Sequence, residues 1–346
     1  MKSTFYRSAL FLSAGALLIA SCKRHPAESE VVVFGTNVVI PDYQSKPLKA
    51  YQLSEENAIN EVTALNNVNQ LLMAMGEQLN FDLTNKMKEG DRLFFMNKQD
   101  PSASCMVNLK SGDISANGGT KNYMNYGATP DLLKKEEAMR AAKQYIQQLR
   151  YADLNDVQMV PGHIGGVNMG SHDEQNKSQI FEKFTTVRFN RQFDGIPVLG
   201  HSRIIVQLAE KGRLHGMIRQ WAAYNGSPVS REAEALPDDI KKSIAQHLTK
   251  ENEASKRITV KQINLVYYES REMIEPALHV ICEVELPRSK TDSTRVTYPY
   301  DIVEPILKNP RMVYTYMAES HRDQPKQNDE VNTKEPPKRG EDEQKQ

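Results

Sequence analysis

The sequence contains few cysteines, no excess charge of either sign and no motif that arranges metal ligands. Its 346 residues include three cysteines, and none stands in a Cys-x-x-Cys or zinc-like spacing, which argues against redox catalysis and structural zinc. The 44 basic and 44 acidic residues balance. This balance gives no electrostatic case for a nucleic-acid partner.

Long apolar runs are also missing after the N-terminus. Residues 8–20 form an apolar or small-residue run behind a short basic start at Lys2 and Arg7. This run is too short to span a bilayer, and a small residue precedes Cys22, so the segment is typical of an export signal. No later stretch approaches the roughly 18 apolar residues of a membrane helix. We therefore predict a soluble body.

The stretch Leu18-Ile19-Ala20-Ser21-Cys22 resembles the lipobox of bacterial lipoproteins. The resemblance implies cleavage after residue 21, lipidation of Cys22, and attachment of the mature protein to a membrane of the cell envelope through its acyl chains. Lys23 follows the cysteine, and the absence of Asp there favours the outer membrane over the inner one by the rule for enteric bacteria. The alternative is an ordinary signal peptide in which Cys22 is incidental.

The other two cysteines, Cys105 and Cys282, lie in apolar segments that resemble strands. We expect two buried thiols that behave as small hydrophobic side chains. A disulfide between them stays open as the alternative, because export would permit it.

The order of elements predicts an α+β fold with three repeated units, each a helix followed by antiparallel strands. The expected organisation is listed here: a signal peptide at 1–21, a tether at 22–50 with short strands at 31–34 and 38–40, units at 51–125, 126–226 and 227–320, and a disordered tail at 321–346. The tail is predicted because it has one large apolar residue, Val331, among charged and polar ones.

Periodicity and turn signals give the elements of each unit. Helices are expected after a cap at Ser54, with Met73 and Met75 in the core, after Thr129-Pro130, and over 238–248. Expected strands are listed here: 93–96, 105–109, 187–193, 204–208, 214–221, 258–268, 277–286 and 296–303. The Gly-rich stretch 161–178 is predicted to be a mobile loop.

The segment Arg191-Gln192-Phe193-Asp194-Gly195-Ile196-Pro197-Val198-Leu199-Gly200 resembles the pro-region of thermolysin-like and fungalysin-like metallopeptidases. Downstream, residues 263–268 and 275–280 resemble the PepSY module of those pro-regions. The resemblance spans roughly 136–286 and implies PepSY- or cystatin-like layers. A generic antiparallel bend that uses Gly195 and Pro197 is the alternative.

No peptidase accompanies this resemblance, because none of the eight histidines belongs to a His-Glu-x-x-His pair. In that family such modules occupy a peptidase cleft, inhibit the enzyme and assist its folding. The sequence does not favour a loop metal site at His163, His172 and Asp173, or a nucleophile at Ser202 with His201 or His215. Trp221 and Tyr224 are expected to close a sheet edge, with an aromatic binding patch as the alternative.

The sequence favours a non-catalytic envelope protein that binds a protein or peptide, without catalytic residues, metal or cofactor. A secreted metallopeptidase is the partner that the resemblance implies. The segment expected to contact it is Phe193, Asp194, Gly195, Ile196, Pro197 and Val198, through addition of a partner strand to a free edge. The first alternative is a structural or assembly subunit of an envelope complex; the second is an enzyme with an unrecognised site.

Overall fold

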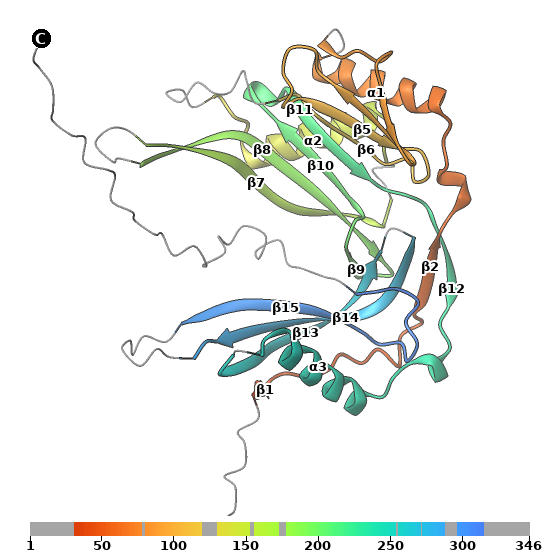
Figure 1. Ribbon diagram of the computed structural model, residues 1–346, viewed down its shortest axis with the longest axis vertical. Helices are drawn as coiled ribbons and strands as arrows, with labels where there is room; N and C mark the ends of the chain where they lie inside the picture. The colour runs from red at the N-terminus through yellow and green to blue at the C-terminus, as the bar shows by residue number, and fades with distance from the viewer. Residues whose placement is uncertain are drawn as a thin grey trace, which may run out of the picture.

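The computed structural model describes residues 31–77, 80–119, 130–152, 156–172, 178–253, 255–270, 272–287 and 296–314. Cys22 with the predicted signal peptide, Thr129, Asp173 and the predicted tail lie outside these ranges. The described chain is mixed α+β, as predicted, with a large, mainly antiparallel sheet and three α-helices (Figure 1). No helix within it is long and apolar enough to cross a membrane.

The strands divide into two lobes that meet at β9 (Figure 1). The N-terminal lobe has a sheet in the order β7-β8-β10-β11-β6-β5-β4-β3, with α1 and α2 packed against it. Its bounds are listed here: α1 Glu61–Met75, α2 Lys135–Gln148, β3 Met87–Glu89, β4 Arg92–Met96, β5 Ser104–Asn108, β6 Ile114–Asn117, β7 Met159–His172, β8 Ser178–Phe193, β10 Arg203–Leu208 and β11 Leu214–Gln220.

The C-terminal lobe is built around the long hairpin of β13 and β14 (Figure 1). Strands β1 and β9 pair in parallel with β13, β2 and β15 pair with β14, and β12 pairs with β2. Its bounds are listed here: β1 Val32–Phe34, β2 Lys49–Leu53, β9 Ile196–Leu199, β12 Tyr224–Pro228, α3 Pro237–Glu251, β13 Arg257–Glu269, β14 Met273–Glu285 and β15 Thr297–Pro305. Helix α3 covers the face that points away from the N-terminal lobe.

Helix α1 begins later than the sequence predicts. Ser54 caps a short 3₁₀ turn at Glu55–Asn57, and the α-helix begins after Asn60, whose side chain accepts a hydrogen bond from the Thr63 amide at 2.9 Å. The buried face carries Met75, as predicted, but Met73 is 56% exposed. The Met73 prediction was wrong because Met73 lies next to the apolar stripe rather than within it.

The predicted loop at 161–178 is largely strand. Strand β7 runs from Met159 to His172 and pairs with β8, with irregular register at Pro161/Ile164 and Val167/Asn168. Glycine weakens strand propensity and conceals the alternating pattern, so the sequence signal failed here although the backbone hydrogen bonds form. The predicted strand at 38–40 is also absent from the described structure, whereas β1 confirms the one at 31–34.

The lobes have separate hydrophobic cores. The first combines α1 and α2 with their shared sheet, and Trp221 lies at its margin. The second joins α3, through Ile240, Ile244 and Leu248, to β13, β14 and β15. Elements from the first two predicted units thus share one core, and the repeat of PepSY-like units stays a prediction.

Cys105 lies in the first core and Cys282 in the second, and both are free thiols. Burial raises the pKa of each to about 12. The prediction of two buried, unpaired thiols is confirmed.

Candidate functional site

The bend predicted after Phe193 is a tight turn between β8 and β9. Asp194 and Gly195 both have positive φ, at 50° and 76°, and Phe193 pairs with Ile196 across the turn. Two consecutive left-handed residues are typical of the tightest hairpin loops, in which Asp-Gly is a favoured pair. The sequence signal for the turn was therefore local and sufficient.

Phe193 itself points into the structure. Its ring stacks on Tyr51 of β2 with centroids 4.1 Å apart, and meets the edge of Tyr267 of β13 at 5.9 Å. This aromatic cluster fastens β8 of the N-terminal lobe to two strands of the C-terminal lobe. Burying three large rings contributes stability on the order of several kcal/mol.

The short strand β9 has a strand of this chain on each side. Ile196 and Pro197 pair with β8, and Val198 and Leu199 pair in parallel with β13. A partner strand therefore finds this position taken, which argues against strand addition at β9. Asp194, Gly195 and Pro197 are exposed, and partner contact at these residues stays a prediction.

Beside this turn, a buried polar network links the lobes. The Arg191 side chain donates to the Ser202 hydroxyl at 3.0 Å, and that hydroxyl donates to Glu269 at 2.9 Å. The Ser202 backbone amide also donates to Glu269. Arg191, Ser202 and Glu269 are all less than 5% exposed. These hydrogen bonds therefore connect β8 to the end of β13 and are shielded from solvent.

Aromatic rings complete the network. The Arg191 guanidinium lies 4.3 Å from the centroid of the Trp221 ring, and the Tyr224 hydroxyl donates to Glu269 at 2.6 Å. Burial lowers the pKa of Arg191, while nearby Glu269 opposes that shift. Burial and Glu269 both raise the pKa of Tyr224, so its hydroxyl stays protonated and remains a donor. The prediction that Trp221 and Tyr224 close a sheet edge did not include these contacts with Arg191 and Glu269.

Close backbone approach at Gly200 allows the network to form. Gly200 has φ of 128°, and a Cβ built there would lie 2.6 Å from the carbonyl oxygen of Glu269. Any other side chain at this position would push the loop containing Ser202 away from β13.

A cavity of about 590 Å³ opens next to this network. Five connections between strands contribute to it: β3–β4, β5–β6, β9–β10, β11–β12 and β13–β14. The lining residues that matter most are listed here: Leu53, Met106, Ala222 and Tyr224 on the apolar side, and Glu89, Asp91, Arg92, Lys110, Asp113, His201, Glu269 and Glu272 on the polar side. The site therefore belongs to both lobes.

Charges on the cavity wall are mostly acidic and mostly solvated. Five carboxylates face two basic side chains and one histidine. Lys110 of the N-terminal lobe forms an ion pair with Glu272 of the C-terminal lobe at 2.7 Å, with both side chains more than half exposed. Glu272 raises the pKa of Lys110, and Lys110 lowers the pKa of Glu272. This bridge crosses the cavity rim rather than its floor.

The other candidate residues of the sequence have different surroundings. Ser202 is committed to Arg191 and Glu269, and the His215 ring stacks on Phe184 at 4.1 Å, where burial lowers its pKa to about 4. His163 lies on β7. Within the described ranges, no group of three or more metal-ligating side chains comes together.

Sequence reasoning missed Arg191 and Glu269 because charged residues are exposed by default. Arg191 does alternate with the buried Phe189 and Phe193 along β8, and strict alternation was the signal that could have identified it as inward-facing.

Comparisons with known proteins leave the family open. No protein-family model matches the chain, and a search of curated proteins finds no match. An uncharacterized protein from Eubacterium rectale has a crystal structure that superposes with a TM-score of 0.48 at 12% identity, covering 83% of this chain and 92% of that one. The C-terminal domain of YpeB from Bacillus megaterium superposes with a TM-score of 0.32 at 9% identity, covering 70% and 98%.

Both TM-scores lie below 0.5, so neither superposition carries an argument about function. The resemblance to PepSY and metallopeptidase pro-regions stays a prediction.

Proposed function

We propose that this protein is a lipid-anchored component of the bacterial cell envelope that binds a protein or peptide partner and catalyses no reaction. The cavity between the lobes is the observation that carries the binding proposal. It is open, it combines apolar walls with solvated charges, and both lobes supply its lining, which are the properties of a recognition site.

The fate of the polar groups around the cavity supports binding rather than catalysis. Glu269 and Tyr224 reach the lining, yet they bond to each other, and Glu269 also holds Ser202. Catalysis by a serine needs a hydroxyl that is free to attack and a base that takes its proton. Here the hydroxyl of Ser202 is buried and joins two strands.

The sequence supplies the other parts of the proposal. Cys22 would hold the body at a membrane through its acyl chains, with the outer membrane favoured. A secreted metallopeptidase is the partner implied by the pro-region resemblance, and this protein would then inhibit the enzyme or assist its folding.

Photo-cross-linking in native envelopes tests this proposal. A benzophenone amino acid replaces Met106 on the cavity wall, and a matched one replaces Met96, which is 48% exposed on β4 and is not among the cavity-lining residues. We expect one protein to be joined from position 106 and not from 96, and to rebind the purified mature chain. Equal products from both positions, or failure of the purified pair to associate, would contradict binding at the cavity.

The identity of the cross-linked protein separates the functional classes. A secreted peptidase whose activity changes in the rebuilt complex supports the pro-region-like role. Membrane or cell-wall subunits in fixed stoichiometry would replace it with the role of an assembly subunit.

A further inference from the structure

The inner face of the C-terminal sheet, opposite α3, carries a small apolar surface. Val266 and Tyr268 of β13, Ala277 of β14 and Val303 of β15 form it, and we call it the Tyr268 surface. The last described residues of the chain, Arg311 to Tyr314, lie on it. The chain therefore places a short segment of its own against a sheet face.

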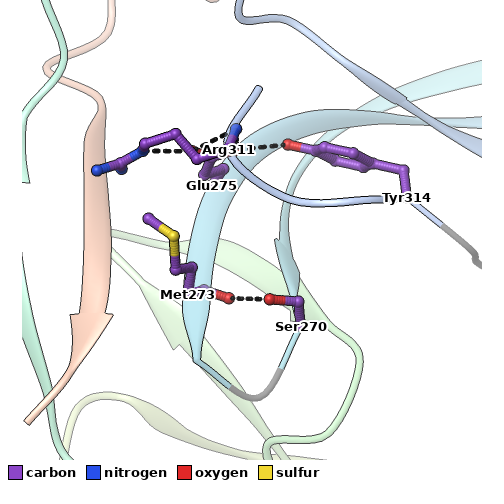
Figure 2. A network of polar contacts seen from close by, with 5 residues as sticks. All are labelled: Ser270, Met273, Glu275, Arg311 and Tyr314. Atoms are coloured by element: carbon purple, nitrogen blue, oxygen red, sulfur yellow. Dashed lines mark hydrogen bonds and ion pairs between the residues drawn. The ribbon is translucent and has the colours of Figure 1, made fainter. Parts of the chain in front are cut away.

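A fully buried carboxylate fixes this segment. Glu275 is 0% exposed, and it accepts hydrogen bonds from the Arg311 backbone amide at 3.2 Å and from the Arg311 Nε at 2.8 Å. The Tyr314 hydroxyl donates to the same carboxylate at 3.4 Å. Figure 2 shows Arg311 and Tyr314 approaching Glu275 from opposite sides, with Ser270 and Met273 closing the β13–β14 turn below.

The side chains of the other residues in the segment point either toward the Tyr268 surface or away from it. The Tyr314 ring stacks on Tyr268 with centroids 5.0 Å apart, and Met312 packs against the same surface. Val313 points outward and is 78% exposed. Recognition therefore uses an arginine, the following apolar residue and an aromatic residue three positions after the arginine.

We propose that the Tyr268 surface with Glu275 is a peptide-recognition site that the chain fills with its own residues 311–314. The partner that fits it is a protein segment that contains an arginine followed three residues later by an aromatic residue. Such a segment would compete with residues 311–314, and the Tyr268 surface would become a second contact besides the cavity.

Three features allow a partner segment to displace residues 311–314. The chain is tied to the body as far as Lys308, whose amide donates to the Ala233 carbonyl at 2.9 Å, so residues 311–314 can be released while the chain before them stays in place. The Arg311 side chain is 54% exposed and lies beside a hollow of about 270 Å³ lined by Ala50 and Pro228. Release of Arg311 removes the cation that pairs with Glu275 at 2.8 Å, so the vacated carboxylate favours a basic group.

Peptide binding to the full chain tests the proposal. The probe is acetyl-Asn-Pro-Arg-Met-Val-Tyr-amide, and the receptor is the Arg311→Ala/Tyr314→Ala variant, which lacks the two side chains that bind Glu275. We expect this variant to bind the probe at least about tenfold more tightly than the wild-type chain or the matched Val313→Ala variant, in which residues 311–314 still compete. Equal affinity for all three, or no loss when glutamine replaces the probe's arginine, would overturn the proposal.

Hydrogen exchange of the wild-type chain gives a second measurement if the double variant does not fold. The Arg311 amide donates to Glu275, whereas the Val280 amide belongs to the ladder of β14. We expect Arg311 to exchange through a local opening, faster than Val280 by a factor of at least about ten. Exchange of both amides at the same rate would mean that the segment never opens alone, and would overturn the proposal.

Discussion

The two lobes bury charges of opposite sign. Among the described residues, the buried lysine and arginine, Lys183 and Arg191, belong to the N-terminal lobe, whereas the buried His215 is neutral at pH 7 because burial lowers its pKa to about 4. The buried carboxylates lie in the C-terminal lobe and are listed here: Glu234, Glu269, Glu275, Glu285 and Glu304. The cations lie against rings, as Lys183 does over Phe181 at 5.3 Å and Arg191 over Trp221 at 4.3 Å.

Three of these carboxylates instead bind segments that pack against the C-terminal sheet. Glu304 holds α3 through Ser243 and His247, Glu275 holds residues 311–314, and Glu269 holds the Ser202 loop and Tyr224. A carboxylate accepts several hydrogen bonds at once, so one buried anion fixes several groups. The C-terminal lobe thus uses buried acids as attachment points, and Glu269 meets the cation of the other lobe at the cavity.

Removing Arg191, the cation of the buried polar network between the lobes, is expected to have the largest effect on stability. Arg191→Met leaves Ser202 without its donor and Glu269 without the nearby positive charge, which costs about 4 kcal/mol of unfolding free energy. Urea unfolding followed by the fluorescence of Trp221, the single tryptophan, measures the change.

The matched control is Arg188→Met on the same strand, where the side chain bonds to Asn190 at 2.7 Å and is only partly buried. It should cost less than about 1 kcal/mol. Equal losses of unfolding free energy in the two variants would mean that the buried polar network does not stabilise the contact between the lobes.

Deleting the segment on Glu275 is expected to cost less, because Arg311 is half exposed. A chain ending at Pro310 loses both donors of Arg311 and the Tyr314 stack, for a loss of about 2 kcal/mol. A chain ending at Tyr314 is the control and should unfold like the full protein. If the two truncated chains unfold at the same urea concentration, Glu275 is not an attachment point.

The contact between α3 and β15 should depend on pH. Glu304 raises the pKa of His247 through a hydrogen bond of 2.9 Å, against the opposing effect of burial. A raised pKa in the folded state adds stability below the unfolded value of 6.5, and this gain disappears as pH rises through the folded value. His247→Gln should therefore cost about 1 kcal/mol at about pH 5 and little at about pH 9. A cost that does not vary with pH would contradict the pairing.

The smallest effect is expected at the rim of the cavity. Lys110 and Glu272 are solvated, and exposed ion pairs contribute little to folding. Lys110→Ala should leave the urea midpoint unchanged within error, while altering partner binding because the pair crosses the cavity. A clear shift in the urea midpoint would show that the ion pair at the rim, like the buried polar network, holds the lobes together.

Local patterns predicted much of the fold. Helix α3 with Ile240, Ile244 and Leu248, the Asp194-Gly195 turn, and the strands β10, β13 and β14 follow from periodicity and turn chemistry within a few residues. Strand β7 was missed because its glycines hide the alternation of apolar and polar residues, and because it becomes a strand by pairing with β8.

Long-range pairing explains the remaining misses. Strand β2 joins the C-terminal sheet through residues such as Ile274, more than 200 positions away, and no local signal reports this. The cavity was missed for the same reason, since its lining comes from five connections far apart in sequence. The turn at 193–198 was recognised, but its packing against Tyr51 and Tyr267 depends on that same pairing.

The most direct test of the account is the affinity of the purified, cross-linked partner for three versions of the mature chain. Met106→Trp places a larger side chain on the cavity wall, Met96→Trp makes the same change outside the cavity, and Asp194→Ala/Pro197→Ala alters the exposed turn. The account predicts that Met106→Trp weakens binding at least about tenfold, by 1.4 kcal/mol or more, while Met96→Trp leaves it unchanged. Loss of binding in the turn variant alone, with Met106→Trp unaffected, would contradict it.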